Sequence, residues 1–392
     1  MEGGTRRKIS QEIDSDSNDS VSLPQDILID ILSRLSVKLL LQCKCVSKYW
    51  LKLITSHDFI KLQVDHANKN NPRFIFTATN SRHPSTMTLF TLDYEAVQHN
   101  AFVSIIDYNC MLSGSFKIVG SCNGLVCLSD YQTCIALCNP ATREIVLEPF
   151  SIFGKLPDQF VLGFGYDFVK DVYKVVRFDI CWRRSDEKDD CQLFVYTVGT
   201  KSWRKIPTPG RFHFSHNVPY MNGALHWFKL STKCNPHLQP NFRSIISFDV
   251  GSEKSQKIPT VSFSYKDVFG FCLGVLQGCL SLCIVPNDKK QIDIWLMKEY
   301  GVKESWTKLF SFNYSPMYAR SAPLVVRKNG EVLIAPDRRS GAINTDRASS
   351  LHMYSYDPTS KTLYLCLYTI RMWNSVSTYA ESLVSIASFS GR

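Results

Sequence analysis

The sequence predicts a small all-α head followed by a large all-β body, a β-propeller of about six blades. Three observations support this. Residues 20–66 carry apolar side chains at helical spacing, whereas the chain from residue 72 alternates short strand-like runs with turn residues. The strand-like runs also recur about every 50 residues, as in kelch-like propeller blades. A chain of 392 residues is too long for one typical core, which favours two parts.

The head begins at SLPQ (22–25), where a Ser cap, a Pro in the first turn and a Gln three residues after the Ser predict a helix start. We expect a second helix over 38–45, a third around Trp50 and a further turn over 59–62. About 45 residues with apolar side chains on several sides bury too little surface alone. The head is therefore predicted to be a binding module. The first helix would carry Ile27, Leu28, Ile31, Leu32 and Leu35 at helical spacing.

The body contains six similar strand-then-turn segments, which begin at residues 88, 134, 192, 244, 291 and 351. Tight turns at Asn123, Asn222, Gln277 and Asn329 start the strand that precedes most of them. Asn-Gly pairs supply the positive φ angles that two-residue hairpins need. Each unit, an apolar strand followed by two more strands, would bury its faces only by stacking in a ring. We expect the last run, YAESLVSI (379–386), to complete the first blade and close the ring.

Two segments of the body admit other interpretations. The stretch 291–310 could be an amphipathic helix, but Ile292, Ile294 and Leu296 alternate with the residues between them, which predicts two strands and a turn. The uncharged run 269–285 is too short and too rich in Gly for a membrane span. We expect it to form two buried strands with a turn at Gln277 and Gly278.

The composition, with 44% hydrophobic and 20% charged residues, is typical of a soluble globular protein. The formal net charge is +10, and the residues after 70 carry nearly all of the excess. This excess fits an acidic partner, but the favoured interpretation is that it keeps a large domain soluble, and no nucleic-acid-binding motif accompanies it. The polar stretch 1–20 predicts no secretory signal, so the fourteen cysteines are expected to be reduced and packed in the core. We expect no cofactor, no metal and no membrane span. The expected location is the cytoplasm, with the nucleus as an open second location.

Motifs for catalysis are missing from the sequence. It contains neither a GxSxG nucleophile motif nor a phosphate-binding GxxxxGK[ST] loop. His213, His216 and His226 lie near one another in the chain, but no acid or Cys partner accompanies them in register for a metal. We therefore predict a protein that is not an enzyme.

The head stretch LPQDILIDILSRLSVKLLLQCKCVSKYW (23–50) resembles the F-box, with Leu-Pro, an acid, an apolar helix, Arg-Leu and then Lys-Cys-Val-Ser-Lys-x-Trp. The resemblance implies docking on the Skp-type adaptor of a cullin-based ubiquitin ligase. One departure is Ser36, where Pro is usual, and Ser caps a helix well. The residues that would form the docking surface or its immediate support are Leu23, Pro24, Ile27, Ile31, Leu35, Leu40, Val46 and Trp50.

The body resembles the F-box-associated interaction domain of plant F-box proteins, in pieces such as GSCNGLVCL (120–128), CNPATRE (138–144) and YAESLVSI (379–386). S-locus F-box proteins and F-box proteins that lower immune-receptor levels share this layout. The implied boundaries are a disordered tail over 1–19, an F-box over 20–66 and the propeller over 72–390. The implied function is a non-catalytic, target-recognising subunit of a Skp–cullin–F-box ubiquitin ligase that leads its target to the proteasome.

Two other functions stay open at this point. The chain could be an S-locus F-box protein that recognises style ribonucleases, although those are typically basic and match a positive body poorly. From another class, it could be a kelch-type scaffold or oxidase without a ligase role. Loops usually carry recognition on a rigid scaffold, so we expect an unidentified target to contact the loops 181–190, 211–220, 234–241 and 337–350. The candidate contacts are Arg183, Arg184, Phe212, His213, Arg338 and Arg339.

Overall fold

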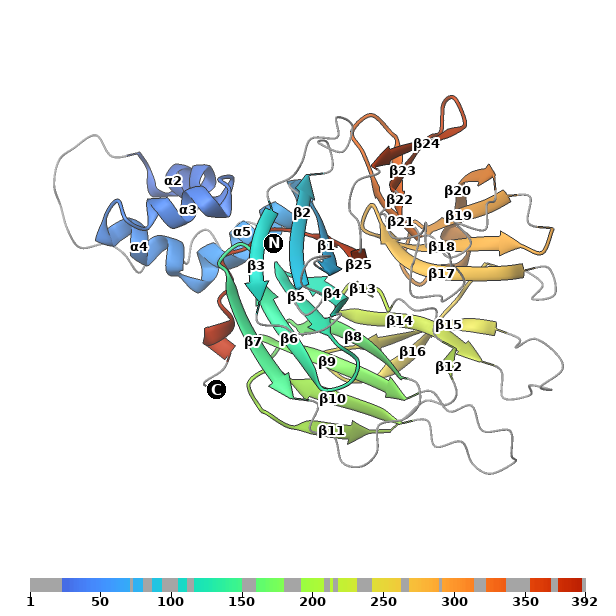
Figure 1. The fold of residues 1–392 in the computed structure, drawn as a ribbon, viewed down its shortest axis with the longest axis horizontal. Coiled ribbons are helices and arrows are strands. Elements are labelled where there is room, and N and C mark those ends of the chain that lie inside the picture. The colour runs from blue at the N-terminus through green and yellow to red at the C-terminus, as the bar shows by residue number, and fades with distance from the viewer. Residues whose placement is uncertain are drawn as a thin grey trace.

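A computed structural model shows a helical head beside a six-bladed propeller (Figure 1). The structure describes residues 23–70, 73–79, 87–93, 105–110, 116–149, 160–179, 192–207, 212–213, 218–230, 242–261, 268–288, 291–313, 322–335, 353–367 and 373–389.

The head consists of four helices, α2 (Gln25–Ser33), α3 (Val37–Cys43), α4 (Lys48–Thr55) and α5 (His57–Asn70). Two of the helix starts are capped by serine, because the Ser36 and Ser47 hydroxyls accept hydrogen bonds from the N–H groups of Leu39 and Trp50. Ser36 thus replaces the usual Pro without loss of the helix. The predicted cap at Ser22 lies outside the described residues, and Pro24 occupies the N-cap position of α2.

The propeller contains six antiparallel sheets. Blade 1 is β25 (Trp373–Tyr379), β1 (Arg73–Thr79), β2 (Met87–Asp93) and β3 (Ile105–Cys110); blade 2 is β4 (Lys117–Cys122), β5 (Leu125–Ser129), β6 (Cys134–Asn139) and β7 (Glu144–Pro149). Blade 3 is β8 (Phe160–Asp167), β9 (Val172–Asp179), β10 (Leu193–Thr197) and β11 (Trp203–Ile206). Blade 4 is β12 (Phe212–His213) with β13 (Tyr220–Met221), then β14 (Ala224–Leu230), β15 (Phe242–Asp249) and β16 (Ser255–Ile258). Blade 5 is β17 (Val268–Leu276), β18 (Cys279–Pro286), β19 (Gln291–Met297) and β20 (Trp306–Asn313); blade 6 is β21 (Ala322–Val326), β22 (Val332–Ala335), β23 (Met353–Asp357) and β24 (Thr362–Leu367).

The predicted repeat corresponds to the blades, but it was one strand short. The six segments found in the sequence contain the third strand of each blade, namely β2, β6, β10, β15, β19 and β23. The stretch 291–310 forms two strands, and 269–285 forms two strands around Gln277 and Gly278, both as predicted. The three-strand repeat did not include the innermost strand of the blade, although β17 of blade 5 was predicted separately as the first strand of 269–285. Besides pairing with the second strand of its own blade, the innermost strand contacts neighbouring blades, as β4 does with β8 and β17 with β21.

The ring is closed by a C-terminal strand, as predicted, but by a different one. β25 pairs with β1 from Arg73 against Tyr379 to Ala78 against Trp373, so it supplies the innermost strand of blade 1. Figure 1 shows this red strand beside the blue β1. The predicted strand 379–386 shares only Tyr379 with β25. Residues 380–385 have no strand structure and lead into a short 3₁₀ helix, η6 (Ile386–Phe389).

The turns of the blades divide the propeller into two faces. In blades 2 to 6 neighbouring strands are antiparallel, so the first-to-second and third-to-fourth connections lie at the same end of every blade. The head lies at this end: Asp171, between β8 and β9, contacts His57 of α5, and Ala141, between β6 and β7, packs against the core of the head. We call this end the head face. The opposite end, the loop face, receives the connections between second and third strands and between blades.

Candidate functional site

The head carries an exposed apolar surface. Ile27 and Ile31 stand one helical turn apart on α2 and are 48% and 45% exposed, whereas Ile29 and Leu32 of the same helix are buried. Figure 1 shows α2, α3 and α4 farther from the propeller than α5. Contiguous exposed apolar side chains usually mark an interaction site. The large apolar residues exposed on the head are Leu23, Ile27, Ile31, Leu39, Val46, Tyr49 and Leu51.

The predicted docking residues separate into surface and support. Leu23, Pro24, Ile27, Ile31 and Val46 are exposed. Leu35 and Trp50 are half-buried against the core of the head, and Leu40 is completely buried within it. The two groups should therefore behave differently on mutation.

Three exposed residues of this surface were missed from the sequence: Leu39, Tyr49 and Leu51. The signal for Leu39 was present, since the run Leu39-Leu40-Leu41 is too apolar for a solvated helix face. Tyr49 and Leu51 flank the motif residue Trp50, and nothing in their spacing indicates which of the three faces outward.

A pocket of about 200 Å³ lies where the head meets blade 1. Its walls carry both signs of charge, from Arg34 and Arg73 and from Asp93 and Glu381, and the Arg73 guanidinium pairs with the Glu381 carboxylate. Within the part of the chain that the structure describes, no group of three or more His, Cys, Asp or Glu residues is placed to hold a metal ion. Nine cysteines in that part form no disulfide, and five of them are buried, as predicted for core thiols.

His226 belongs to the fold and not to a histidine cluster. Its ring nitrogens lie 3.2 Å from the Pro219 carbonyl oxygen and 2.6 Å from the Tyr300 hydroxyl, so both are occupied. Burial lowers the pKa of His226 to about 4. His216 and the side chain of His213 lie outside the described residues.

The predicted target contacts lie mostly outside the described residues. This holds for Arg183, Arg184, Arg338 and Arg339, while Phe212 and His213 form β12, which pairs with β14. The strand ends around these stretches can nevertheless be placed. Residues 180–192 join the second and third strands of blade 3, and 336–352 join those of blade 6, so all four flanking strand ends lie at the loop face.

The fold and the head surface define a class of protein: a propeller joined to a helical docking module. The family model described as F-box associated beta propeller domain matches residues 76–386, and the one described as F-box-like matches residues 21–60. The chain belongs to the F-box proteins that carry this propeller domain. This combination implies a substrate-recognition role in Skp–cullin–F-box ligases, in which F-box proteins are generally non-catalytic subunits.

Relatives from Arabidopsis thaliana agree with this assignment. F-box protein CPR1 is 30% identical over 316 residues, which cover 74% of this chain and 73% of that protein. An F-box/kelch-repeat protein of the same plant is 30% identical over 303 residues, covering 74% of this chain and 79% of the relative.

Among solved structures, TolB from Acinetobacter baumannii aligns over 83% of this chain and 73% of its own, with a TM-score of 0.45 and 12% identity. Within the described residues, no helix is long and apolar enough to cross a membrane.

Proposed function

We propose that this chain recruits a protein target to a Skp–cullin–F-box ubiquitin ligase for ubiquitination and proteasomal degradation. The observation that carries the proposal is the exposed apolar surface of α2, α3 and α4, on a head matching the F-box. The chain itself performs no covalent step. It holds the target near the ubiquitin-charged enzyme and so raises the effective concentration of the target lysines.

The chemistry that this proximity serves is acyl transfer. The ε-amine of a target lysine attacks the thioester carbon that joins ubiquitin to a cysteine of the conjugating enzyme. A C–N bond forms, the C–S bond breaks, and the proton lost by the amine leaves with the thiol. The contribution of this chain is the position of the lysine, which depends on how the target and the adaptor are held.

The target is proposed to bind at the loop face, since the head occupies the other end of the blades. Three of the four predicted loop regions, 181–190, 234–241 and 337–350, belong to the second-to-third strand connections of blades 3, 4 and 6, whose flanking strand ends lie at the loop face. Co-purification with residues 23–60 deleted tests whether the propeller binds a target, because the target would be held without ubiquitin transfer. We propose the cytoplasm as the place of action, with the nucleus as a second location.

Adaptor binding is tested on the surface residues Ile27 and Ile31. The double variant Ile27→Ala/Ile31→Ala should weaken binding to a panel of Skp-type adaptors by about 2 kcal/mol, or about 30-fold in Kd, because both side chains would be interface anchors. Calorimetric titration measures Kd, and the thermal midpoint confirms folding. Leu309→Ala is the matched control, since Leu309 is 41% exposed on β20, a strand of blade 5. A wild-type chain that binds no adaptor of the panel would overturn the proposal.

The supporting residue Leu40 serves as a contrast. Leu40→Ala empties a fully buried position in the head, so it should lower stability by about 2–5 kcal/mol and reduce adaptor binding only through unfolding. Binding and helix content should therefore fall together in this variant. In Ile27→Ala/Ile31→Ala only binding should fall.

A further inference from the structure

The segment 380–389, which follows β25, lies between the head and the propeller. Its residues 380–385 are irregular and lead into η6, and its apolar side chains are buried on two sides. Leu383 is buried in the core of the head with Ile29, Leu40 and Phe59. The next residue, Val384, is buried in the propeller, together with residues 386 and 389. In Figure 1 the red helical turn η6, at the end of this segment, lies beside β7 of blade 2 and below the head.

The polar groups of this segment are also held from both sides. From the head, the Gln63 side chain donates to the Glu381 carbonyl oxygen at 3.2 Å and accepts from the Leu383 N–H at 3.4 Å. From blade 2, the Asn139 amide donates to the carbonyl oxygens of Ser382 at 3.0 Å and Val384 at 2.7 Å. Gln63 and Asn139 are themselves buried, so these hydrogen bonds are shielded from water.

A carboxylate of blade 2 completes the attachment. Glu144 accepts hydrogen bonds from the Ser385 hydroxyl at 2.8 Å and from the Ile386 N–H at 2.6 Å. Hydrogen bonds to a charged acceptor are stronger than neutral ones. One direct polar contact between head and propeller, the His57 ring with the Asp171 carboxylate at 3.0 Å, involves a histidine that is 57% exposed and is therefore weak.

We infer that residues 380–389 form a C-terminal strut that fixes the orientation of the adaptor-binding head relative to the propeller. Gln63, Glu144 and Leu383 are then positioning residues for ubiquitin transfer. The inference rests on the proposed function. A fixed orientation presents the same lysines to the conjugating enzyme in every complex, whereas a loose one spreads them over many directions and lowers the concentration of each at the thioester.

The test compares Gln63→Ala/Glu144→Ala and Leu383→Ala with the control Glu299→Ala, an exposed carboxylate on the connection between β19 and β20. Each chain is purified with a Skp-type adaptor. Small-angle scattering then measures the spread of overall dimensions. The variants should show a broader distribution and a larger maximum dimension than the wild type and the control, at unchanged adaptor Kd. The milder double variant keeps the test valid if Leu383→Ala fails to fold.

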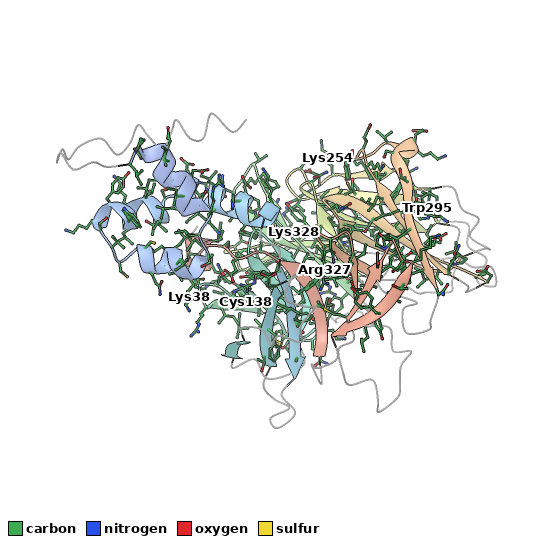
Figure 2. The ribbon with its side chains drawn as sticks, turned by 90° about the horizontal axis from the view of Figure 1, so that it is seen from above. Lys38, Cys138, Lys254, Trp295, Arg327 and Lys328 are labelled. Carbon is green, nitrogen blue, oxygen red and sulfur yellow. The ribbon has the colours of Figure 1, made fainter. Side chains whose placement is uncertain are left out.

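Ubiquitin transfer provides the functional measurement, with lysines of the chain itself as acceptors. Lys170, Lys201, Lys254 and Lys328 are exposed on turns of the head face, and Lys254 and Lys328 can be found in Figure 2. In the reconstituted ligase, mass spectrometry should show a restricted set of modified lysines for the wild type. For the variants it should show a wider set, with a several-fold lower rate at the preferred positions.

The outcomes separate this inference from the proposed function. Scattering curves that superpose on the wild type would overturn the strut, and so would loss of adaptor binding, because the segment would then support the fold of the head. A wild-type chain that binds no adaptor would instead overturn the proposed function and leave the scattering comparison of the free chains to decide the strut.

Discussion

Buried charges join the blades at the level of single residues. Lys174 of β9 is 1% exposed and contacts the Asp167 carboxylate at 2.9 Å, the Val250 carbonyl oxygen at 2.7 Å and the Glu253 carboxylate at 3.1 Å. Burial alone would raise the pKa of Asp167, but hydrogen bonds from Lys170 N–H and Lys174 lower it. Lys174 therefore links blade 3 to the β15–β16 turn of blade 4 as a paired, fully coordinated cation.

Removal of the Lys174 ammonium group should lower the stability of the fold. Lys174→Met leaves the Asp167 carboxylate buried without its cation, so we expect a loss of about 3 kcal/mol in unfolding free energy. Arg204→Met is the matched control, since Arg204 pairs with the same Glu253 at 2.6 Å but is 59% exposed, and it should cost under about 1 kcal/mol. Urea denaturation followed by tryptophan fluorescence measures both. Equal losses would contradict the assignment of Lys174 as the link.

The buried side chain of His226 predicts that the free energy of unfolding depends on pH. Its pKa is about 4 in the folded chain and about 6.5 when unfolded, because burial disfavours the charged ring. Between these values the unfolded chain binds a proton that the folded chain does not, so stability is full above about pH 6.5 and falls toward pH 4. The loss attributable to His226 is roughly 3 kcal/mol.

The variant His226→Gln isolates this contribution, because Gln does not titrate. Between pH 7 and pH 4.5, the urea midpoint of unfolding should fall further in the wild type than in the variant. Parallel pH profiles of the two proteins would show that another group carries the acid sensitivity.

At the scale of elements, two turns of the same type have different surroundings. Gly124 and Gly278 both have positive φ, at 77° and 71°. A Cβ on Gly278 would meet nothing within 4 Å, whereas one on Gly124 would lie 2.9 Å from the backbone nitrogen of Ser382 in the strut. Gly278→Ala should cost about 1 kcal/mol for the left-handed backbone. Gly124→Ala should cost clearly more, because the strut must move. Thermal midpoints of the two variants compare the costs, and a smaller loss for Gly124→Ala would contradict the close packing.

Most hairpins could be predicted because their signal is local. Asn123-Gly124 and Asn222-Gly223 adopt the positive φ angles that their residue types favour. Helix α5 was predicted too short, since only part of it is apolar. Its later residues Gln63, Val64 and Ala67 are buried against other parts of the fold, and the polar residues Asp65 and His66 lie between them. Tertiary packing, which the sequence alone does not display, determines that length.

The strand β25, which closes the ring, shows why some elements could not be predicted from the sequence. β25 has the sequence WNSVSTY, whose small polar residues give little strand signal. Ser375 is nevertheless buried, where it bonds to Thr77 at 2.7 Å and accepts from the Ile118 N–H at 2.7 Å. The strut has the apolar pattern of a buried strand because it is buried on two sides. Burial produces the same pattern with or without a strand, so the two segments were confused.

For the whole molecule, ring closure predicts cooperative unfolding. A chain that ends at Leu367 lacks β25, so it leaves Thr77 and the Ile118 N–H without these partners and exposes the inner edge of β1. We expect such a chain to lose its sharp calorimetric transition and to bind an apolar dye. A chain that ends at Phe389 retains β25 and the strut and should unfold as the full chain does. A sharp transition in the shorter chain would show that five complete blades and an open blade 1 suffice for cooperative unfolding.

The position of Leu383 in the core of the head has a consequence for biosynthesis. Gln63 and Leu383 are 320 residues apart in sequence, so the ribosome must add nearly the whole propeller before the residue that completes the head is made. At the usual 5–20 residues per second this takes on the order of 15–60 seconds. During that interval α2 to α5 can form, but their core stays unfilled and unanchored to the blades. A nascent chain or a truncated one that lacks residue 383 would therefore carry an incomplete head, and only a polypeptide extended beyond this residue can present the adaptor surface in its final orientation.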